Sequence, residues 1–282
     1  MNVLPFDPVT QDPVTRDPRY PAALTQVAFD SAGSQLIGAL LIAQGQGPHP
    51  TVVLLHGFPG FERNFDLAQA ARRAGWNALV FHYRGCWGSQ GAYAFGHVLE
   101  DVGAALRFLG SDEGHAHRVD PEHIALVGHS LGGFAALMSA SDSPQVHAVA
   151  SISGVNFGAY GAGWSDSAAQ RQGALAFFEE GLTPLRGTSA QALLDEVVTH
   201  IGQWNVLDGV APLCGRPVLL VGASQDEVIP VEQHHTPLVR AFERAGATEL
   251  SHHVLDCDHG YSNCRIALAR LLVDWLGRVR LE

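Results

Sequence analysis

Residues 123–137 read HIALVGHSLGGFAAL, and this stretch decides the fold. The apolar run HIALV predicts a buried strand, and FAAL begins an apolar helix. Between them lies the pattern Gly-x-Ser-x-Gly, centred on Ser130. A serine at such a sharp strand-to-helix turn has a strained backbone, and side chains at Gly128 and Gly132 would collide with neighbouring structure. The pattern therefore predicts a nucleophile elbow, with the Ser130 hydroxyl at a helix N-terminus that favours developing negative charge.

Strands and helices alternate on both sides of this turn. Short unbroken apolar runs predict buried parallel strands at 51–55, 78–82, 123–128, 146–152 and 217–222, after strand-like segments from residue 24 onward and before a weaker strand at 249–255. Helical patterns occupy 64–74, 94–110, 131–141, 231–245 and 261–279. This alternation predicts an α/β fold, with a mostly parallel sheet covered by helices on both faces.

One interval, about 155–215, interrupts the alternation. It contains two helical patterns, at about 164–180 and 189–204, and no core strand. An insertion at the carboxyl edge of a sheet lies over the place where open α/β sheets bind ligands. We therefore expect a small helical cap that shapes a pocket. Its aromatic residues suit either a pocket wall or the core of the cap, so none is assigned a binding role: Phe157, Tyr160, Trp164, Phe177, Phe178 and Trp204.

A serine hydroxyl needs a base to take its proton, and the base needs an acid to orient it. Asp226 lies just past the strand PVLLVG, and His259 lies in the loop before the last helix. The chain order Ser130, Asp226, His259 is the one expected for an elbow of this kind. We therefore predict these three residues as a catalytic triad. Glu227 is expected to point away from the site, and Asp256 and Asp258 lie too near His259 in sequence to approach its ring favourably.

The run HGFPG at 56–60 follows the strand TVVLL. A tetrahedral intermediate requires two fixed N–H donors for its oxyanion. One is the residue after the nucleophile, Leu131, and the other should come from this loop. Since Pro59 has no N–H, the second donor is predicted to be Phe58.

Composition narrows the function classes. The chain has 282 residues, of which 46% are hydrophobic and 16% charged, and such a chain forms a globular core. The net charge of -11 argues against nucleic acid and against an anionic membrane surface. All 17 basic residues are arginine, which excludes lysine Schiff-base chemistry and any P-loop.

No apolar run is long enough to cross a bilayer, and no secretory signal is visible, so a cytoplasmic protein is expected. The four cysteines fit a reducing compartment. Residues 1–22, with five prolines, are expected to form an irregular arm on the surface, followed by one domain over 23–282. The pairs His234-His235 and His252-His253 are interpreted as surface or strand positions, so neither a metal nor a cofactor is expected.

Together, these residues resemble the α/β-hydrolases. The likeness rests on HGFPG at 56–60, GHSLGG at 128–133, Asp226 in SQDEVIP and His259 in DHGYS, and it covers about residues 24–280. The loop YRGCWGS at 83–89 is similar to one in single-domain relatives of prolyl oligopeptidases, acylaminoacyl peptidases and feruloyl-type esterases. The resemblance implies an eight-stranded sheet and hydrolysis through an acyl-enzyme.

The function expected from the sequence is a serine hydrolase, and more narrowly a carboxylesterase acting on small or medium acyl esters. An exopeptidase or amidase that takes a short peptide or amide remains an alternative, because the same triad serves both reactions. The chain carries no propeller-sized extension, which favours the esterase. A non-catalytic ligand-binding protein is the alternative from another class, because this fold also serves as a receptor. Whether the chain forms a homo-oligomer stays open.

Overall fold

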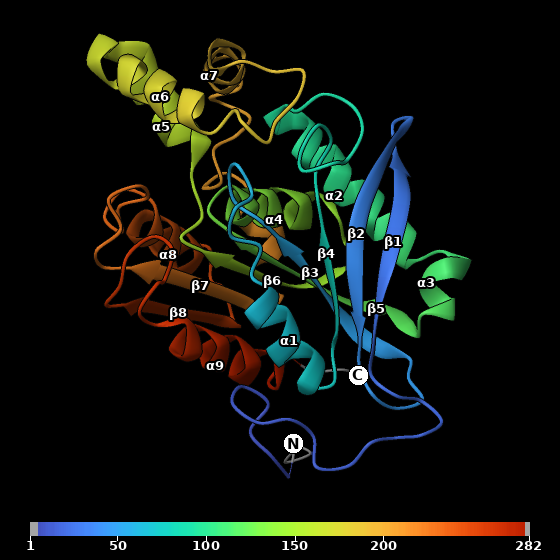
Figure 1. Cartoon of the computed structure of the whole chain (residues 1–282). Coiled ribbons are helices and arrows are strands. Elements are labelled where there is room, and N and C mark those ends of the chain that lie inside the picture. Colours follow the sequence, from blue (N-terminus) through green and yellow to red (C-terminus); the bar gives the residue numbers. More distant parts are fainter. Residues whose placement is uncertain (1–4, 280–282) are drawn as a thin grey trace.

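An eight-stranded sheet organises the chain in this computed structural model, which describes residues 5–279 (Figure 1). The strands are β1 (Ala23–Ser31), β2 (Ser34–Ile42), β3 (His49–Leu55), β4 (Asn77–Phe81), β5 (Val119–His129), β6 (Val146–Ile152), β7 (Val218–Ala223) and β8 (Leu250–Leu255). Their spatial order is β1-β2-β4-β3-β5-β6-β7-β8. β2 is antiparallel to both β1 and β4, and the other neighbours are parallel. The predicted fold class is confirmed.

Two apolar cores lie on opposite faces of this sheet. α1 (Phe65–Arg73) and α9 (Arg265–Leu276) pack on one face, through residues such as Leu67 and Leu272. α2 (Phe95–Leu109), α4 (Leu131–Asp142) and α8 (His235–Arg244) pack on the other, through Val102, Phe134 and Phe242. A short helix, α3 (Asp112–Ala116), joins α2 to β5. The sheet is therefore covered on both sides, as the buried strands require.

The insertion between β6 and β7 contains three helices where the sequence predicted two. They are α5 (Phe157–Asp166), α6 (Ala168–Glu180) and α7 (Ala190–Thr199), followed by one 3₁₀ turn at Ala211–Leu213. The glycines of α5 lower its helix propensity, which concealed it in the sequence. The side chains of Asn156 and Ser167 cap α5 and α6, so Ser167 divides the predicted helix into two. Figure 1 shows these helices above one edge of the sheet.

The register of the parallel strands brings the predicted site segments to that edge. Leu55 at the end of β3 pairs with Gly128 of β5, and Ala223 at the end of β7 pairs with Leu255 at the end of β8. The loops that follow these strands carry the residues expected to act on a substrate. They therefore emerge side by side, at the carboxyl ends where α/β sheets place their ligands.

Residues 5–22 form neither a helix nor a strand, and residues 1–4 of the predicted arm lie outside the described range. This segment runs beneath α1 and α9 (Figure 1). Arg73 Nε donates to the Pro8 carbonyl at 2.6 Å, and Arg270 pairs with Asp7 at 2.7 Å. Among the described helices, none is long and apolar enough to span a membrane.

Candidate active site

Ser130 occupies the turn between β5 and α4, with φ 57° and ψ −119°. This left-handed backbone is unusual for a residue that carries a side chain. A Cβ at Gly128 would lie 1.9 Å from the Gly132 carbonyl oxygen, and a Cβ at Gly132 would lie 1.9 Å from that of Leu55. Both glycines are therefore required for the turn to form, and the turn holds Ser130 at the N-terminus of α4.

Asp226 and His259, 33 residues apart, are brought together by the loops after β7 and β8. His259 Nδ1 donates to Asp226 Oδ2 at 2.7 Å. The other carboxylate oxygen accepts from the Val228 and Ile229 amides at 2.9 and 2.7 Å. The Asp226 side chain is fully buried, whereas that of His259 is 21% exposed. In a neutral His259 the single ring proton is on Nδ1, which donates the hydrogen bond to the carboxylate. Nε2 is therefore the nitrogen that can accept a proton.

The environment of Asp226 keeps it ionised. Burial acts to raise its pKa, but hydrogen bonds from His259, Ile229 and Ser153 and the charge of His259 together hold that pKa below its usual value. A carboxylate in this state can orient an imidazole and stabilise the imidazolium that forms during proton transfer.

The competing acidic residues have other partners. Asp256 accepts from Ser224 and Gln225, and Asp258 accepts from the amide and hydroxyl of Ser262. Glu227 was expected to point away from the site, yet it is one of the residues that line the cavity. The turn after Asp226 folds back so that the amides at 228 and 229 reach its carboxylate, and this places the intervening residue at the cavity.

Two residues behind Asp226 were not anticipated. Ser153, after β6, hydrogen-bonds to Asp226 and lies 3.0 Å from the Tyr261 hydroxyl, which also bonds to the Val221 carbonyl at 3.2 Å. The Tyr261 hydroxyl donates to the Val221 carbonyl, whereas either hydroxyl can be the donor in the contact between Ser153 and Tyr261. Ser153 and Tyr261 both have positive φ, 41° and 57°. Little in the sequence indicated them, because each is a single polar residue in a loop that follows a predicted strand.

His129 links the serine turn to the histidine loop. Its Nε2 donates to the His259 carbonyl at 2.8 Å, and the two rings have centroids 4.8 Å apart. Burial lowers the pKa of His129 to about 3, so the ring is neutral. This bond holds the backbone of His259 against the residue that precedes Ser130.

The loop after β3 lies against the serine. A Cβ at Gly57 would be 3.0 Å from Ser130 Cβ, so only glycine fits there comfortably. The Trp87 Nε1 donates to the Pro59 carbonyl at 2.8 Å and fixes the loop. Within residues 5–279, the backbone N–H groups of Phe58 and Leu131 donate to no protein acceptor. Both amides are thus free to bind an oxyanion.

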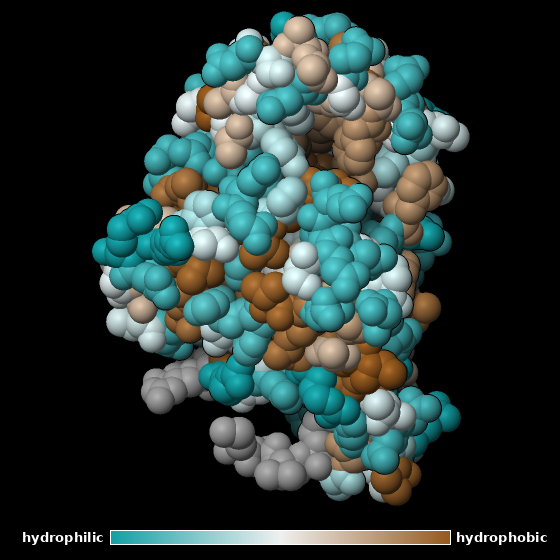
Figure 2. Space-filling view, turned by 90° about the vertical axis from the view of Figure 1, so that its left-hand side faces the viewer, coloured by the Kyte–Doolittle hydropathy of each residue, from teal (hydrophilic) through white to brown (hydrophobic). Residues whose placement is uncertain are grey.

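A cavity of about 600 Å³ opens beside Ser130 and Leu131. Its walls come from α5, α6, the start of α2 and the loop after β7, so the insertion does shape a pocket. Seven of the residues that line it are aromatic: Phe58, Phe95, Phe157, Tyr160, Trp164, Phe177 and Phe178. Trp204 instead packs in the core, against His200 and Phe134. Figure 2 shows the surface hollowed in its upper part, with brown and tan side chains around the opening.

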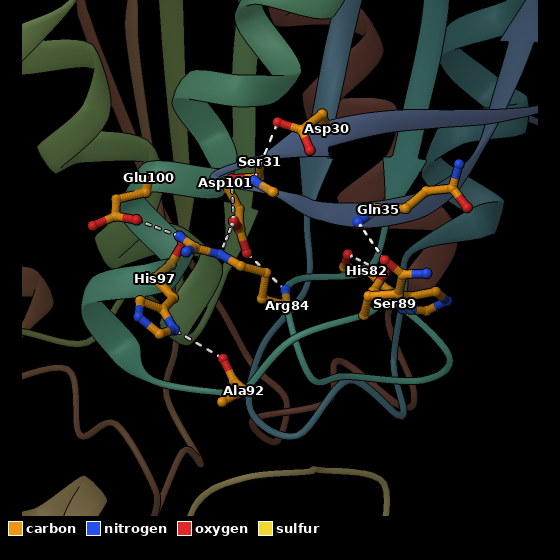
Figure 3. A network of polar contacts seen from close by, with 12 residues as sticks. Asp30, Ser31, Gln35, His82, Arg84, Ser89, Ala92, His97, Glu100 and Asp101 are labelled. Atoms are coloured by element: carbon orange, nitrogen blue, oxygen red, sulfur yellow. Dashed lines mark hydrogen bonds and ion pairs between the residues drawn. The ribbon is translucent and has the colours of Figure 1, made fainter.

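Arg84, in the loop after β4, belongs to a structural network (Figure 3). It pairs with the buried Asp101 at 2.6 Å and with Glu100 at 2.5 Å, and Asp101 also accepts from Ser31. These ion pairs therefore explain why an arginine is present at position 84. Of the paired histidines, His252 and His253 lie in β8, as interpreted from the sequence. The interpretation as a surface or strand position is wrong for His234, which is buried just before α8, where its Nδ1 accepts from the Asn156 backbone N–H at 3.0 Å. All four cysteines are free thiols.

The fold and this site define a class of protein, the α/β-hydrolases. Residues 52–267 match the model of the alpha/beta hydrolase family, and the chain belongs to that family. A stretch of 91 residues is 36% identical to "Putative esterase YheT" of Escherichia coli (strain K12). That stretch covers 30% of this chain and 25% of the relative, so the match spans about a quarter of the curated protein.

Solved structures share the fold at low sequence identity. The esterase Pf2001 of Pyrococcus furiosus is 16% identical, with a TM-score of 0.66 and 92% of each chain covered. Est1E of Butyrivibrio proteoclasticus is 18% identical, with a TM-score of 0.67, covering 89% of this chain and 97% of that one. An acylaminoacyl peptidase of Pyrococcus horikoshii is 17% identical, with a TM-score of 0.70, covering 93% of this chain and 42% of that one.

Proposed function

We propose that this protein is a serine hydrolase that cleaves carboxylic esters through an acyl-enzyme. Ser130 is the nucleophile, His259 the general base and acid, and Asp226 the residue that orients His259. The amides of Phe58 and Leu131 form the oxyanion hole.

In the first half-reaction, Ser130 Oγ attacks the ester carbonyl carbon while its proton passes to His259 Nε2. The carbonyl oxygen becomes an oxyanion that accepts hydrogen bonds from the two free amides. When the intermediate collapses, the alcohol leaves with the proton held by His259. A water molecule then attacks the acyl-enzyme and gives a proton to the same nitrogen. The acid is released, and Ser130 recovers its proton.

One observation carries this proposal: the 2.7 Å bond from His259 to the buried Asp226, in a loop that His129 joins to the left-handed turn of Ser130. A buried carboxylate costs stability unless its bonds compensate. Here the carboxylate of Asp226 orients His259, and the other ring nitrogen of His259 is left to accept a proton. Nucleophilic catalysis by a serine needs this arrangement. The esterase names of YheT, Pf2001 and Est1E point in the same direction.

The cavity supports a substrate with an apolar acyl group. Its wall is chiefly apolar, with seven aromatic residues, and Glu227 is the only acidic or basic residue among those that line it. At about 600 Å³ it is within the ordinary range for small-molecule sites, about 300–1,000 Å³. We infer small or medium acyl esters as substrates.

The free cysteines support a reducing compartment such as the cytoplasm.

A fluorophosphonate probe tests the nucleophile. The wild-type protein should be labelled at Ser130, and Ser130→Ala should not be labelled while keeping the same circular dichroism spectrum. A folded wild-type protein that resists the probe would favour a non-catalytic binding protein. Hydrolysis of one acyl group, presented as an ester and as an amide, then separates esterase from amidase: we expect turnover of the ester and little turnover of the amide.

A further inference from the structure

A cluster of three potential metal ligands joins the start of the HGFPG loop to the loop after β4, and none of the three takes part in the proposed chemistry. His56 follows β3, and His82 and Cys86 lie in the loop after β4. One ligand atom from each residue lies within 4.8 Å of the other two. His56 is 2% exposed and Cys86 is completely buried. Two imidazoles and a thiol form a ligand set that suits zinc.

His56 has one ring nitrogen that is free to bind a metal. Its Nδ1 donates to the Gly57 carbonyl at 2.8 Å, so the lone pair of the neutral ring is on Nε2. Within residues 5–279, Nε2 is buried and has no hydrogen-bond partner. A carbonyl that fixes the tautomer while the opposite nitrogen remains free is the usual arrangement of a metal-binding histidine. Burial keeps the ring neutral by lowering its pKa to about 3.

The other two groups are also incompletely satisfied. His82 Nδ1 is buried and unpartnered among the described residues. The Cys86 thiol has one long contact, 3.5 Å from Sγ to the Pro59 carbonyl. Buried polar atoms normally have partners, and two orphaned imidazole nitrogens beside one thiol require an explanation.

We propose that His56, His82 and Cys86 bind a zinc ion. The zinc forms bonds to His56 Nε2, His82 Nδ1 and Cys86 Sγ, and the protons of the thiol and of any protonated ligand nitrogen pass to solvent. Zinc bonds of about 2.0–2.3 Å place two nitrogens and one sulfur about 3.3–3.6 Å apart in a tetrahedral site, so atoms that lie within 4.8 Å of one another must approach by up to about 1.5 Å. A fourth position remains for water.

Arg63 opposes this binding and offers a test of it. Its Nη1 lies 3.4 Å from His82 Nε2, a long contact in which the guanidinium donates. That contact leaves the proton of His82 on Nδ1, and the proton must move before the nitrogen can bind zinc. The positive charge also repels a cation. Arg63→Gln should therefore bind zinc more tightly than the wild type.

A metal here would act on the loop that carries Phe58. His56 bonds to the Gly57 carbonyl, and Cys86 and Trp87 both contact the Pro59 carbonyl, on either side of the Phe58 amide. Resting on the proposed function, we expect zinc to slow ester hydrolysis by displacing that amide. The binding measurement below needs no substrate, so its failure and the failure of the proposed function are distinguishable.

Cobalt titration of the full chain, first freed of metal with a chelator, tests the site. We expect one equivalent of Co²⁺ to produce thiolate-to-cobalt charge-transfer absorption, which an equivalent of Zn²⁺ abolishes. Cys86→Ser should remove the band, and His82→Gln should weaken binding by at least about tenfold. Cys214→Ser is the matched control, because Cys214 is a partly buried thiol that also contacts a backbone carbonyl, and it should leave the band intact.

Two results would overturn the proposal: wild-type protein without the charge-transfer band, or a band that survives in Cys86→Ser. Circular dichroism establishes that each variant is folded. Where Cys86→Ser does not fold, His82→Gln decides, because His82 is only partly buried and its replacement leaves the thiol in place. Cobalt binding unchanged in that variant would likewise exclude the site.

Discussion

His129 donates from Nε2 to the backbone carbonyl of His259 at 2.8 Å, across 130 residues of sequence. The bond joins the turn that carries the proposed nucleophile to the loop that carries the proposed base. Since His259 is also bound to Asp226 through its ring, both its backbone and its side chain are held by residues far away in the sequence. The positions of the three proposed triad residues thus depend on contacts between loops, which is where substitutions should have their largest effects.

Asp226→Asn should lower kcat by about 10⁴-fold, the scale of the equivalent change in a serine protease, because an amide favours the wrong imidazole tautomer. Asp258→Asn is the matched control: among the described residues its carboxylate hydrogen-bonds to Ser262 alone, so this variant should retain activity within about tenfold. Ester hydrolysis by both folded variants between about pH 5 and 9 checks this. Collapse of Asp258→Asn with an active Asp226→Asn would assign the acid to the loop before α9.

Ser153→Ala should reduce kcat by about tenfold and destabilise the fold by about 1–3 kcal/mol, because a hydrogen bond to a buried carboxylate is lost. Ser139→Ala provides the comparison: its hydroxyl is buried without a partner among the described residues, so its removal should cost little. Steady-state kinetics and urea unfolding of both variants measure the difference. Equal behaviour of the two would mean that Ser153 does not position Asp226.

Gly132→Ala should prevent folding or cost several kcal/mol, because its Cβ would lie 1.9 Å from the Leu55 carbonyl oxygen. Gly103→Ala is a control inside α2, where the nearest atom would be an arginine nitrogen at 3.5 Å. That change should stabilise the protein by about 0.5–1 kcal/mol through helix propensity. Thermal unfolding of the two variants tests the prediction, which is wrong if Gly132→Ala unfolds at the wild-type temperature.

Ala174→Leu should shorten the acyl chain that the enzyme accepts, because Ala174 is buried on α6 and lines the cavity. We expect kcat/KM to fall at least tenfold for a medium-chain ester while the acetate ester changes little. Ala176→Leu makes the same change on the same helix but outside this cavity, and it should leave the chain-length profile unaltered. An identical profile for both variants would mean that the acyl group lies elsewhere.

The sequence indicated which residues meet at the edge of the sheet more completely than it indicated the helices of the insertion. Gly128, Ser130 and Gly132 form a local pattern whose glycines have one physical reason, and strand order alone placed Asp226 and His259 at the same edge. The contacts of Ser153 and Tyr261 depend instead on how separate loops meet in space, which no spacing encodes. α5 was missed because its cap at Asn156 and its tertiary packing outweigh its weak propensity.

Acidification should destabilise the protein below about pH 6.5, because buried histidines resist protonation. Burial lowers the pKa of His129 to about 3 and those of His234 and His235 to about 4. The unfolded chain binds protons near pH 6.5 and the folded chain does not, so the contribution is complete above that pH and is lost as the pH falls toward 4. Each histidine adds up to about 1.4 kcal/mol per pH unit to the slope of the free energy of unfolding against pH.

Urea unfolding at about pH 7.5, 6 and 5 should show this slope. His235→Gln should reduce the slope, whereas replacing the exposed His115 should not. A pH-independent free energy of unfolding over this range would contradict the buried, neutral state of these rings.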